Sequence, residues 1–193
     1  MDKTHLRVMR AEDFDPTQSD PVDPQTLAAT ATIVEAVRRQ GAQGLRDAIT
    51  RFEDRRDDPI LIDREALKRA FLRLAPDTQA LLKRTAGRIT RFAEAQLGSL
   101  QPLDIAISGG RAGHTLSPVK RAGCYAPGGT FPLPSSVLMT ALTARVAGVD
   151  SVVVATPSKD DVMLGAAWLA GADQVLWAGG AHAIAALAYG VEG

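Results

Sequence analysis

The charged residues of this chain are concentrated in its first half, and this asymmetry limits what the second half can be. Residues 1–100 carry 16 acidic and 17 basic side chains, whereas residues 101–193 carry 6 and 5, together with 13 of the 17 glycines. A segment with so few charges cannot be covered by solvated side chains on all sides. We therefore expect the second half to form a sheet buried on both faces, an interface, or both, with a boundary near residue 120.

The second half alternates short apolar runs with helical segments. The expected strands are residues 122–125, 151–155 and 174–178, and the expected helices are residues 134–147, 160–170 and 181–189. Because short connections join them, this alternation predicts parallel strands with right-handed crossovers. The fold class is therefore α/β, with an incomplete Rossmann-like parallel sheet of three βα units over residues 120–193. A further strand normally follows such a helix, so we expect a truncated domain.

The first half has the apolar spacing of helices. Asp23 and Pro24 are typical of a helix start, Gly41 is typical of a stop, and Asp63 is expected to cap a further helix. A longer helix carries apolar side chains at spacings of four, three and four: Leu82, Ala86, Ile89 and Ala93. We expect a loose arm over residues 1–22 and a helical region over residues 23–119, with short strands at 103–107 and 112–118.

The composition excludes several classes of protein. The 22 Lys and Arg residues balance the 22 Asp and Glu residues, so no net field attracts a polyanion, and we expect no nucleic-acid partner. The single cysteine, Cys124, excludes an intramolecular disulfide framework and a Cys-cluster zinc site. No run approaches the roughly 18 apolar residues of a membrane span, and the N-terminus lacks the apolar stretch of a secretion signal. We expect a soluble, cytoplasmic protein with no membrane partner.

Two glycine turns are the candidate ligand-binding segments. Gly179 and Gly180 lie between an expected strand and an expected helix, and Gly128 and Gly129 follow the first strand of the same sheet. Glycine at such an edge lets backbone amides approach a ligand at a helix N-terminus. The alternative is that both are tight connections that need a positive φ. The chain has neither a G-x-G-x-x-G fingerprint nor a P-loop.

The sequences in and around these turns resemble those of a known protein family. The stretches are residues 123–129 (GCYAPGG), 134–139 (PSSVLM), 147–149 (AGV) and 179–190 (GGAHAIAALAYG). They are similar to histidinol dehydrogenase, and the resemblance covers about residues 25–193. It implies an NAD-dependent oxidoreductase of histidine biosynthesis that oxidises L-histidinol through L-histidinal to L-histidine. The family uses two NAD in succession and a bound zinc, and it forms homodimers.

The resemblance assigns cofactor contacts and no catalytic residues. Tyr125 matches a family tyrosine that contacts NAD, and His182 stands where the family commonly has a glutamine that also touches NAD. An imidazole lacks the simultaneous donor and acceptor pair of an amide, so cofactor affinity is in question at that position. The expected cofactor-binding residues are thus Tyr125, Gly128, Gly129, Gly179, Gly180 and His182. The family's zinc ligands and its Glu-His acid/base pair fall beyond Gly193, so we expect neither a metal site nor a catalytic residue here.

The number and spacing of the histidines also predict no metal site in this chain. The three histidines, His5, His114 and His182, are far apart in sequence and lack the neighbours of a zinc motif. We expect His114 at the surface of a hairpin and Cys124 as a small buried hydrophobe. Three functions stay open: the N-terminal part of a histidinol dehydrogenase that is inactive alone, a non-catalytic remnant with weak dinucleotide binding, and a related alcohol dehydrogenase for another substrate. A pure interaction module is a further alternative.

Overall fold

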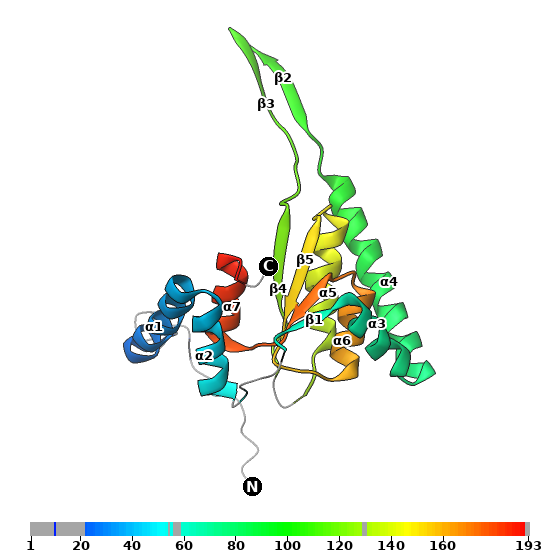
Figure 1. Cartoon of the computed structure of the whole chain (residues 1–193). Helices are drawn as coiled ribbons and strands as arrows, with labels where there is room; N and C mark the ends of the chain where they lie inside the picture. Colours follow the sequence, from blue (N-terminus) through cyan, green and yellow to red (C-terminus); the bar gives the residue numbers. More distant parts are fainter. Residues whose placement is uncertain (1–9, 11–21, 54, 56–58, 129–130, 192–193) are drawn as a thin grey trace.

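The protein is a mixed sheet with helices on both faces and one long hairpin. The computed structural model describes residue 10 and residues 22–53, 55, 59–128 and 131–191. Four strands form the main sheet in the order β1-β6-β5-β4. In Figure 1, α7, α1 and α2 lie on one side of this sheet and α3 to α6 on the other. The expected α/β class is confirmed.

Three strands of the sheet are parallel, as the sequence predicts. They are β4 (Arg121–Tyr125), β5 (Ser151–Ala155) and β6 (Gln174–Leu176). Tyr125 pairs with Ala155 at the carboxyl edge of the sheet, and Ala155 pairs with Leu176. The carboxyl ends of all three strands therefore meet at one edge, where the two glycine turns begin.

The sequence pattern did not predict the fourth strand of the sheet. β1 (Leu61–Asp63) lies in the helical first half and pairs antiparallel with β6, with Ile62 opposite Val175. Three residues are too short to show a strand period, so no sequence pattern marks them. β1 closes one edge of the sheet, and among the described strands β4 forms the other edge.

The helices cover the sheet in two groups. On one face α7 (Gly180–Tyr189) contacts β4 and β5, and α1 (Pro24–Gln40) and α2 (Ala42–Glu53) pack against α7. A Cβ added at Gly123 would lie 2.8 Å from the Leu187 Cβ atom, so this glycine permits the close approach of α7 to β4. The helices on the other face are α3 (Arg64–Arg73), α4 (Pro76–Ser99), α5 (Pro134–Val146) and α6 (Asp161–Leu169).

The expected helix signals of the first half are confirmed. The Asp23 side chain accepts hydrogen bonds from the Gln25 and Thr26 amides at the start of α1, and Gly41 ends that helix at a φ of 57°. Asp63 caps α3 through the Ala66 amide. These helices share buried clusters with the sheet: Phe71 and Leu67 pack in the cluster that holds Val152 and Val154. The boundary near residue 120 stays a prediction, and most of the expected arm lies outside the described residues.

A two-stranded hairpin extends away from the body of the molecule (Figure 1). It comprises β2 (Leu103–Ile107) and β3 (Gly110–His114), and every residue in both strands is exposed. The second strand was expected at residues 112–118 and instead begins at Gly110, after a turn at Gly109 whose φ is 87°. Among the described residues, no helix is long and apolar enough to span a bilayer.

Candidate functional site

The structure brings the two expected glycine turns together at the carboxyl edge of the sheet. Both turns contact the same side chain, Pro157, in the loop after β5. A Cβ added at Gly179 would lie 2.8 Å from the Pro157 Cβ atom, and one at Gly128 would lie 2.5 Å from its Cγ atom. Real Cβ atoms do not approach other atoms so closely, so both glycines are needed for close packing against a proline ring. Gly129 lies outside the described residues.

Tyr125 and the start of α7 are in direct contact. Tyr125 ends β4, and its hydroxyl oxygen accepts a hydrogen bond of 3.1 Å from the Gly180 amide. Gly180 has a φ of 65°, a conformation that a residue with a Cβ adopts only under strain. Since the hydroxyl acts as an acceptor here, its own proton stays available to donate to a further group.

His182 is buried beside this contact and is held by a residue from the first half of the chain. Its side chain is 5% exposed, and its Nε2 atom lies 2.8 Å from the Glu53 Oε1 atom. The Phe52 ring stacks on the imidazole at a centroid distance of 5.9 Å. An ionised carboxylate can only accept, so Nε2 carries the proton that is shared with Glu53.

Glu53, the last residue of α2, is the centre of the site. Its Oε1 atom also accepts a hydrogen bond of 3.0 Å from the Gly179 amide, the N-cap residue of α7. Its Oε2 atom accepts one of 2.5 Å from Arg55 Nη2. The side chain is only 15% exposed. A carboxylate at this position satisfies a helix N–H group and lies in the favourable field of the α7 N-terminus.

These partners keep the Glu53 carboxyl group ionised. Burial alone would raise the pKa of Glu53, but the hydrogen bonds from His182, Gly179 and Arg55 outweigh it and lower the pKa to about 2. The group is therefore a permanent anion at neutral pH.

Arg55 links this anion to the loop after β6. Its Nη2 atom donates to the Trp177 carbonyl at 2.7 Å, and its guanidinium carbon lies 3.6 Å from the centroid of the Trp177 ring. Lys159 Nζ lies at the same distance from that centroid. The Arg55 cation–π contact, its hydrogen bond to Trp177 and its ion pair with Glu53 thus connect the end of α2 to the turn that precedes α7, and Lys159 adds a contact from the loop after β5.

The sequence identified four residues of this cluster as candidates. Tyr125, Gly179, Gly180 and His182 are adjacent, as expected for one edge of a sheet. Glu53, Arg55 and Pro157 were missed, because Glu53 lies 129 residues from His182 and no local spacing relates them. The one available signal was an acidic residue next to an aromatic residue at the end of an amphipathic helix, which is too common to be informative.

The glycine turn does not fit the phosphates of a dinucleotide. Its two amides already donate to Glu53 and Tyr125, and the Glu53 carboxylate is an anion that repels a phosphate. The uncharged parts of a nucleotide fit better, because the Tyr125 hydroxyl keeps a free donor.

The described residues also lack a metal centre. No three His, Cys, Asp or Glu side chains within the described ranges are grouped closely enough to hold an ion, so zinc does not fit this part of the chain. His114 lies on the hairpin, exposed as expected, with Nε2 at 3.1 Å from the Gln101 carbonyl oxygen. Cys124 is buried as expected, and burial raises the pKa of its thiol.

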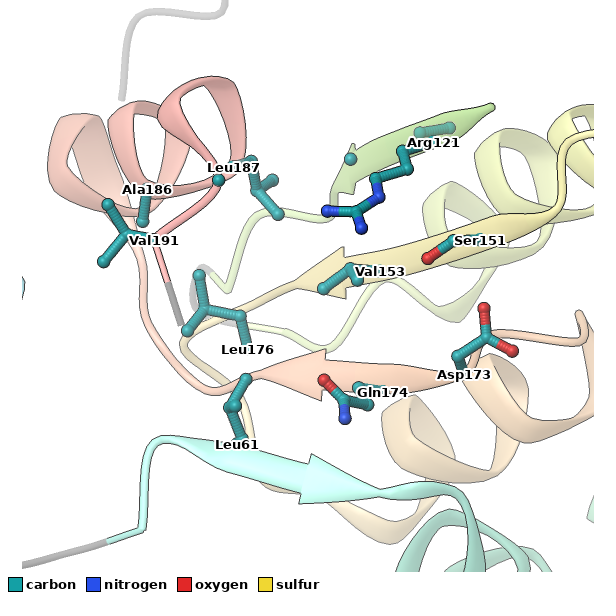
Figure 2. Close-up of a pocket in the computed structure, with 13 residues that line it drawn as sticks. Leu61, Arg121, Ser151, Val153, Asp173, Gln174, Leu176, Ala186, Leu187 and Val191 are labelled. Carbon is teal, nitrogen blue, oxygen red and sulfur yellow. The ribbon is translucent and has the colours of Figure 1, made fainter. Parts of the chain in front are cut away.

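A pocket of about 330 Å³ lies elsewhere, on the α7 face of the sheet (Figure 2). Arg121, Ser151 and Gln174 line it at the amino-terminal ends of the three parallel strands, together with apolar residues such as Val153 and Leu187. None of the expected cofactor-binding residues contributes to it. The pocket and the glycine turns are therefore separate features.

Comparison with known proteins identifies relatives over most of the chain. The sequence profile of the histidinol dehydrogenase family matches residues 17–193. The histidinol dehydrogenase of Chromobacterium violaceum is 39% identical over 180 residues, which cover 88% of this chain and 41% of that protein. The histidinol dehydrogenase of Methanothermobacter thermautotrophicus is 36% identical over 86% of this chain and 40% of its own length.

A solved structure shows the same fold. The crystal structure of histidinol dehydrogenase from Elizabethkingia anophelis superposes with a TM-score of 0.77 and 24% identity, over 90% of this chain and 41% of the other. The chain therefore spans about two fifths of the length of the relatives that it matches.

Proposed function

The chain belongs to the histidinol dehydrogenase family, and we propose on that premise that it forms the N-terminal part of an enzyme that oxidises L-histidinol through L-histidinal to L-histidine. The reaction belongs to histidine biosynthesis and uses NAD as the electron acceptor. The observation that carries the proposal is the match of residues 17–193 to the family. The contact between Tyr125 and the start of α7 supports it, because Tyr125 and Gly180, two of the residues that we expect to contact the cofactor, lie at the same edge of the sheet.

In this proposal the chain contributes the part of the fold that contacts the cofactor. The groups that react with the substrate lie in the part of the family's sequence that this chain does not cover. Oxidation of an alcohol needs a base that takes the hydroxyl proton, or a metal that acidifies it. The Glu53–His182 pair has the right chemistry for a base, but the imidazole is 5% exposed and its Nε2 proton is engaged by Glu53. We therefore assign the Glu53–His182 pair a structural role rather than a catalytic one. We expect this chain to be inactive alone.

A chimeric enzyme tests the proposal. Residues 17–193 replace the matched segment of the Chromobacterium violaceum enzyme, and histidinol-dependent reduction of NAD is measured with the purified protein. We expect turnover. In the same chimera Tyr125→Phe removes one hydroxyl and should raise the KM for NAD by about two- to tenfold, the value of one hydrogen bond. Tyr189→Phe, at an exposed tyrosine on α7, is the matched control and should change nothing. A folded chimera without turnover would contradict the proposal.

A second candidate is a non-catalytic remnant that keeps the fold. The observation that favours it is the Glu53 carboxylate at the start of α7, where a cofactor phosphate would otherwise bind. Under this alternative the chimera folds and binds NAD weakly at most, but it does not reduce NAD. Turnover by the chimera would exclude it.

Assembly and location follow from the same resemblance. We extend the proposal to a cytoplasmic homodimer. Exposed apolar side chains support a protein partner for the hairpin: Leu103, Ile105 and Ile107 are 46%, 48% and 51% exposed, and their alternation along β2 puts them on one face.

A further inference from the structure

We propose that Glu53 determines which part of the cofactor can lie at this edge: its carboxylate occupies the N-terminus of α7, excludes phosphate groups from the Gly179–Gly180 turn, and leaves only uncharged parts of the cofactor to contact Tyr125. This inference deepens the proposed function and rests on it for the identity of the cofactor.

Both amides at the start of α7 already have acceptors within the chain. A helix N-terminus binds phosphate through free N–H groups that point at the ligand. Here the Gly179 amide donates to Glu53 at 3.0 Å, and the Gly180 amide donates to Tyr125 at 3.1 Å. A phosphate at the Gly179 amide would have to replace the Glu53 carboxylate, which is already in place in the folded chain.

The charge of Glu53 also opposes a phosphate at the Gly179 amide. Glu53 is largely buried, so water screens its field poorly, and its ion pair with Arg55 offsets only part of that field. A phosphate oxygen in contact with the Gly179 amide would lie beside this anion, which costs free energy in a low dielectric. Moving the carboxylate away would leave Arg55 and His182 without their partner, and breaking a buried pair is strongly unfavourable.

The Pro157 ring accounts for the glycines of the two turns. Gly128 and Gly179 both pack against Pro157, so a proline ring lies between the two turns. The close backbone approach that these two glycines permit is explained by this ring, so the glycines by themselves do not indicate a pyrophosphate site. The Tyr125 hydroxyl, in contrast, keeps a proton that can be donated to a neutral acceptor such as a carboxamide or ribose oxygen.

The test follows the amide signals of Gly179 and Gly180 by NMR in the ¹⁵N-labelled chain, with inorganic pyrophosphate as the probe. In the wild-type chain we expect no saturable shift at millimolar pyrophosphate. In Glu53→Ala the carboxylate is gone and Arg55 and His182 remain, so we expect saturable binding that is at least about tenfold tighter than in the wild type. Glu35→Ala is the matched control: it removes an exposed carboxylate paired with Arg38 and Arg39, and these amide signals should not respond.

Two results would overturn the inference: a Gly179 shift in the wild type that matches that of Glu53→Ala, or a folded Glu53→Ala chain that does not bind pyrophosphate. If Glu53→Ala does not fold, Glu53→Gln keeps the volume without the charge. It should then bind more tightly than the wild type, and equal affinities would overturn the inference.

Titration of the wild-type chain with NAD separates this inference from the proposed function. If NAD shifts the Tyr125 ring signals and leaves Gly179 unchanged, both are supported. If NAD shifts Gly179, the inference fails while the proposed function stands. If NAD shifts neither residue, cofactor binding by this chain fails, and the pyrophosphate result still decides the role of Glu53.

Discussion

Replacement of Glu53 by glutamine should destabilise the fold at neutral pH. The carboxylate has three donors, the Gly179 amide, Arg55 and His182, and glutamine keeps a similar shape without the charge. The pKa of Glu53 falls from 4.5 to about 2 on folding. At about 1.4 kcal/mol per pKa unit, this shift corresponds to about 3 kcal/mol of stability. Since the glutamine oxygen can still accept from Gly179, we expect a net loss of about 2 kcal/mol.

The pH dependence of this loss is a sharper signature than its size. Because folding lowers the pKa of Glu53, its contribution is fully present above the unfolded value of 4.5 and is lost as pH falls through about 2. The difference between wild type and Glu53→Gln should therefore be constant from pH 7 to pH 5 and should shrink below that.

Urea denaturation followed by circular dichroism at several pH values measures both quantities. Glu35→Gln is the control, because folding also lowers the pKa of Glu35 to about 2, but its ion pairs with Arg38 and Arg39 are exposed. We expect Glu35→Gln to cost less stability than Glu53→Gln, because exposed ion pairs contribute little. A Glu53→Gln loss no larger than that of Glu35→Gln, or a loss that is unchanged at pH 3, would refute the reasoning.

Three further predictions concern packing, the loops of the sheet and association. Gly179→Ala brings a Cβ within 2.8 Å of Pro157 and should cost about 1–3 kcal/mol of stability in urea denaturation. Gly87→Ala, with open space inside α4, is the control and should gain about 0.5–1 kcal/mol. Equal effects of the two substitutions would contradict the packing of Gly179 on Pro157. Arg145→Met should cost about 2 kcal/mol, because Arg145 donates to the Gly171, Val149 and Asp150 carbonyls and pairs with Asp173, and an unchanged melting curve would count against it. Ile105→Lys should weaken self-association of the chain in sedimentation velocity, since it charges the apolar face of β2; a wild-type chain that stays monomeric at all concentrations would remove the basis for this prediction.

The sequence was sufficient to predict the three parallel strands and several helix ends, because the relevant signals are local. Val152 to Val154 mark a buried parallel strand, and Asp23, Gly41 and Asp63 mark helix ends where the structure places them. β1 has three residues and pairs antiparallel with β6, so its strand structure comes from a distant partner. Local patterns cannot show such a pairing.

The candidate site was predictable only in part for the same reason. The carboxyl edge of a parallel sheet brings Tyr125 and Gly180 together, and alternation alone predicts that edge. Glu53 arrives at the edge from α2 through the packing of α2 on α7, which is a tertiary contact. Gly128 and Gly179 also pack against Pro157, a contact that no local pattern indicates, and their role as ligand contacts stays a prediction.

The ionisation of Glu53 in the folded chain is the most direct measure of whether its carboxylate closes the start of α7. The ¹³C shift of the Glu53 side-chain carboxyl carbon can be followed by NMR as the pH is lowered. The structure predicts a midpoint at about 2. A midpoint at or above the ordinary value of 4.5 would mean that the carboxylate is not held by Gly179, Arg55 and His182.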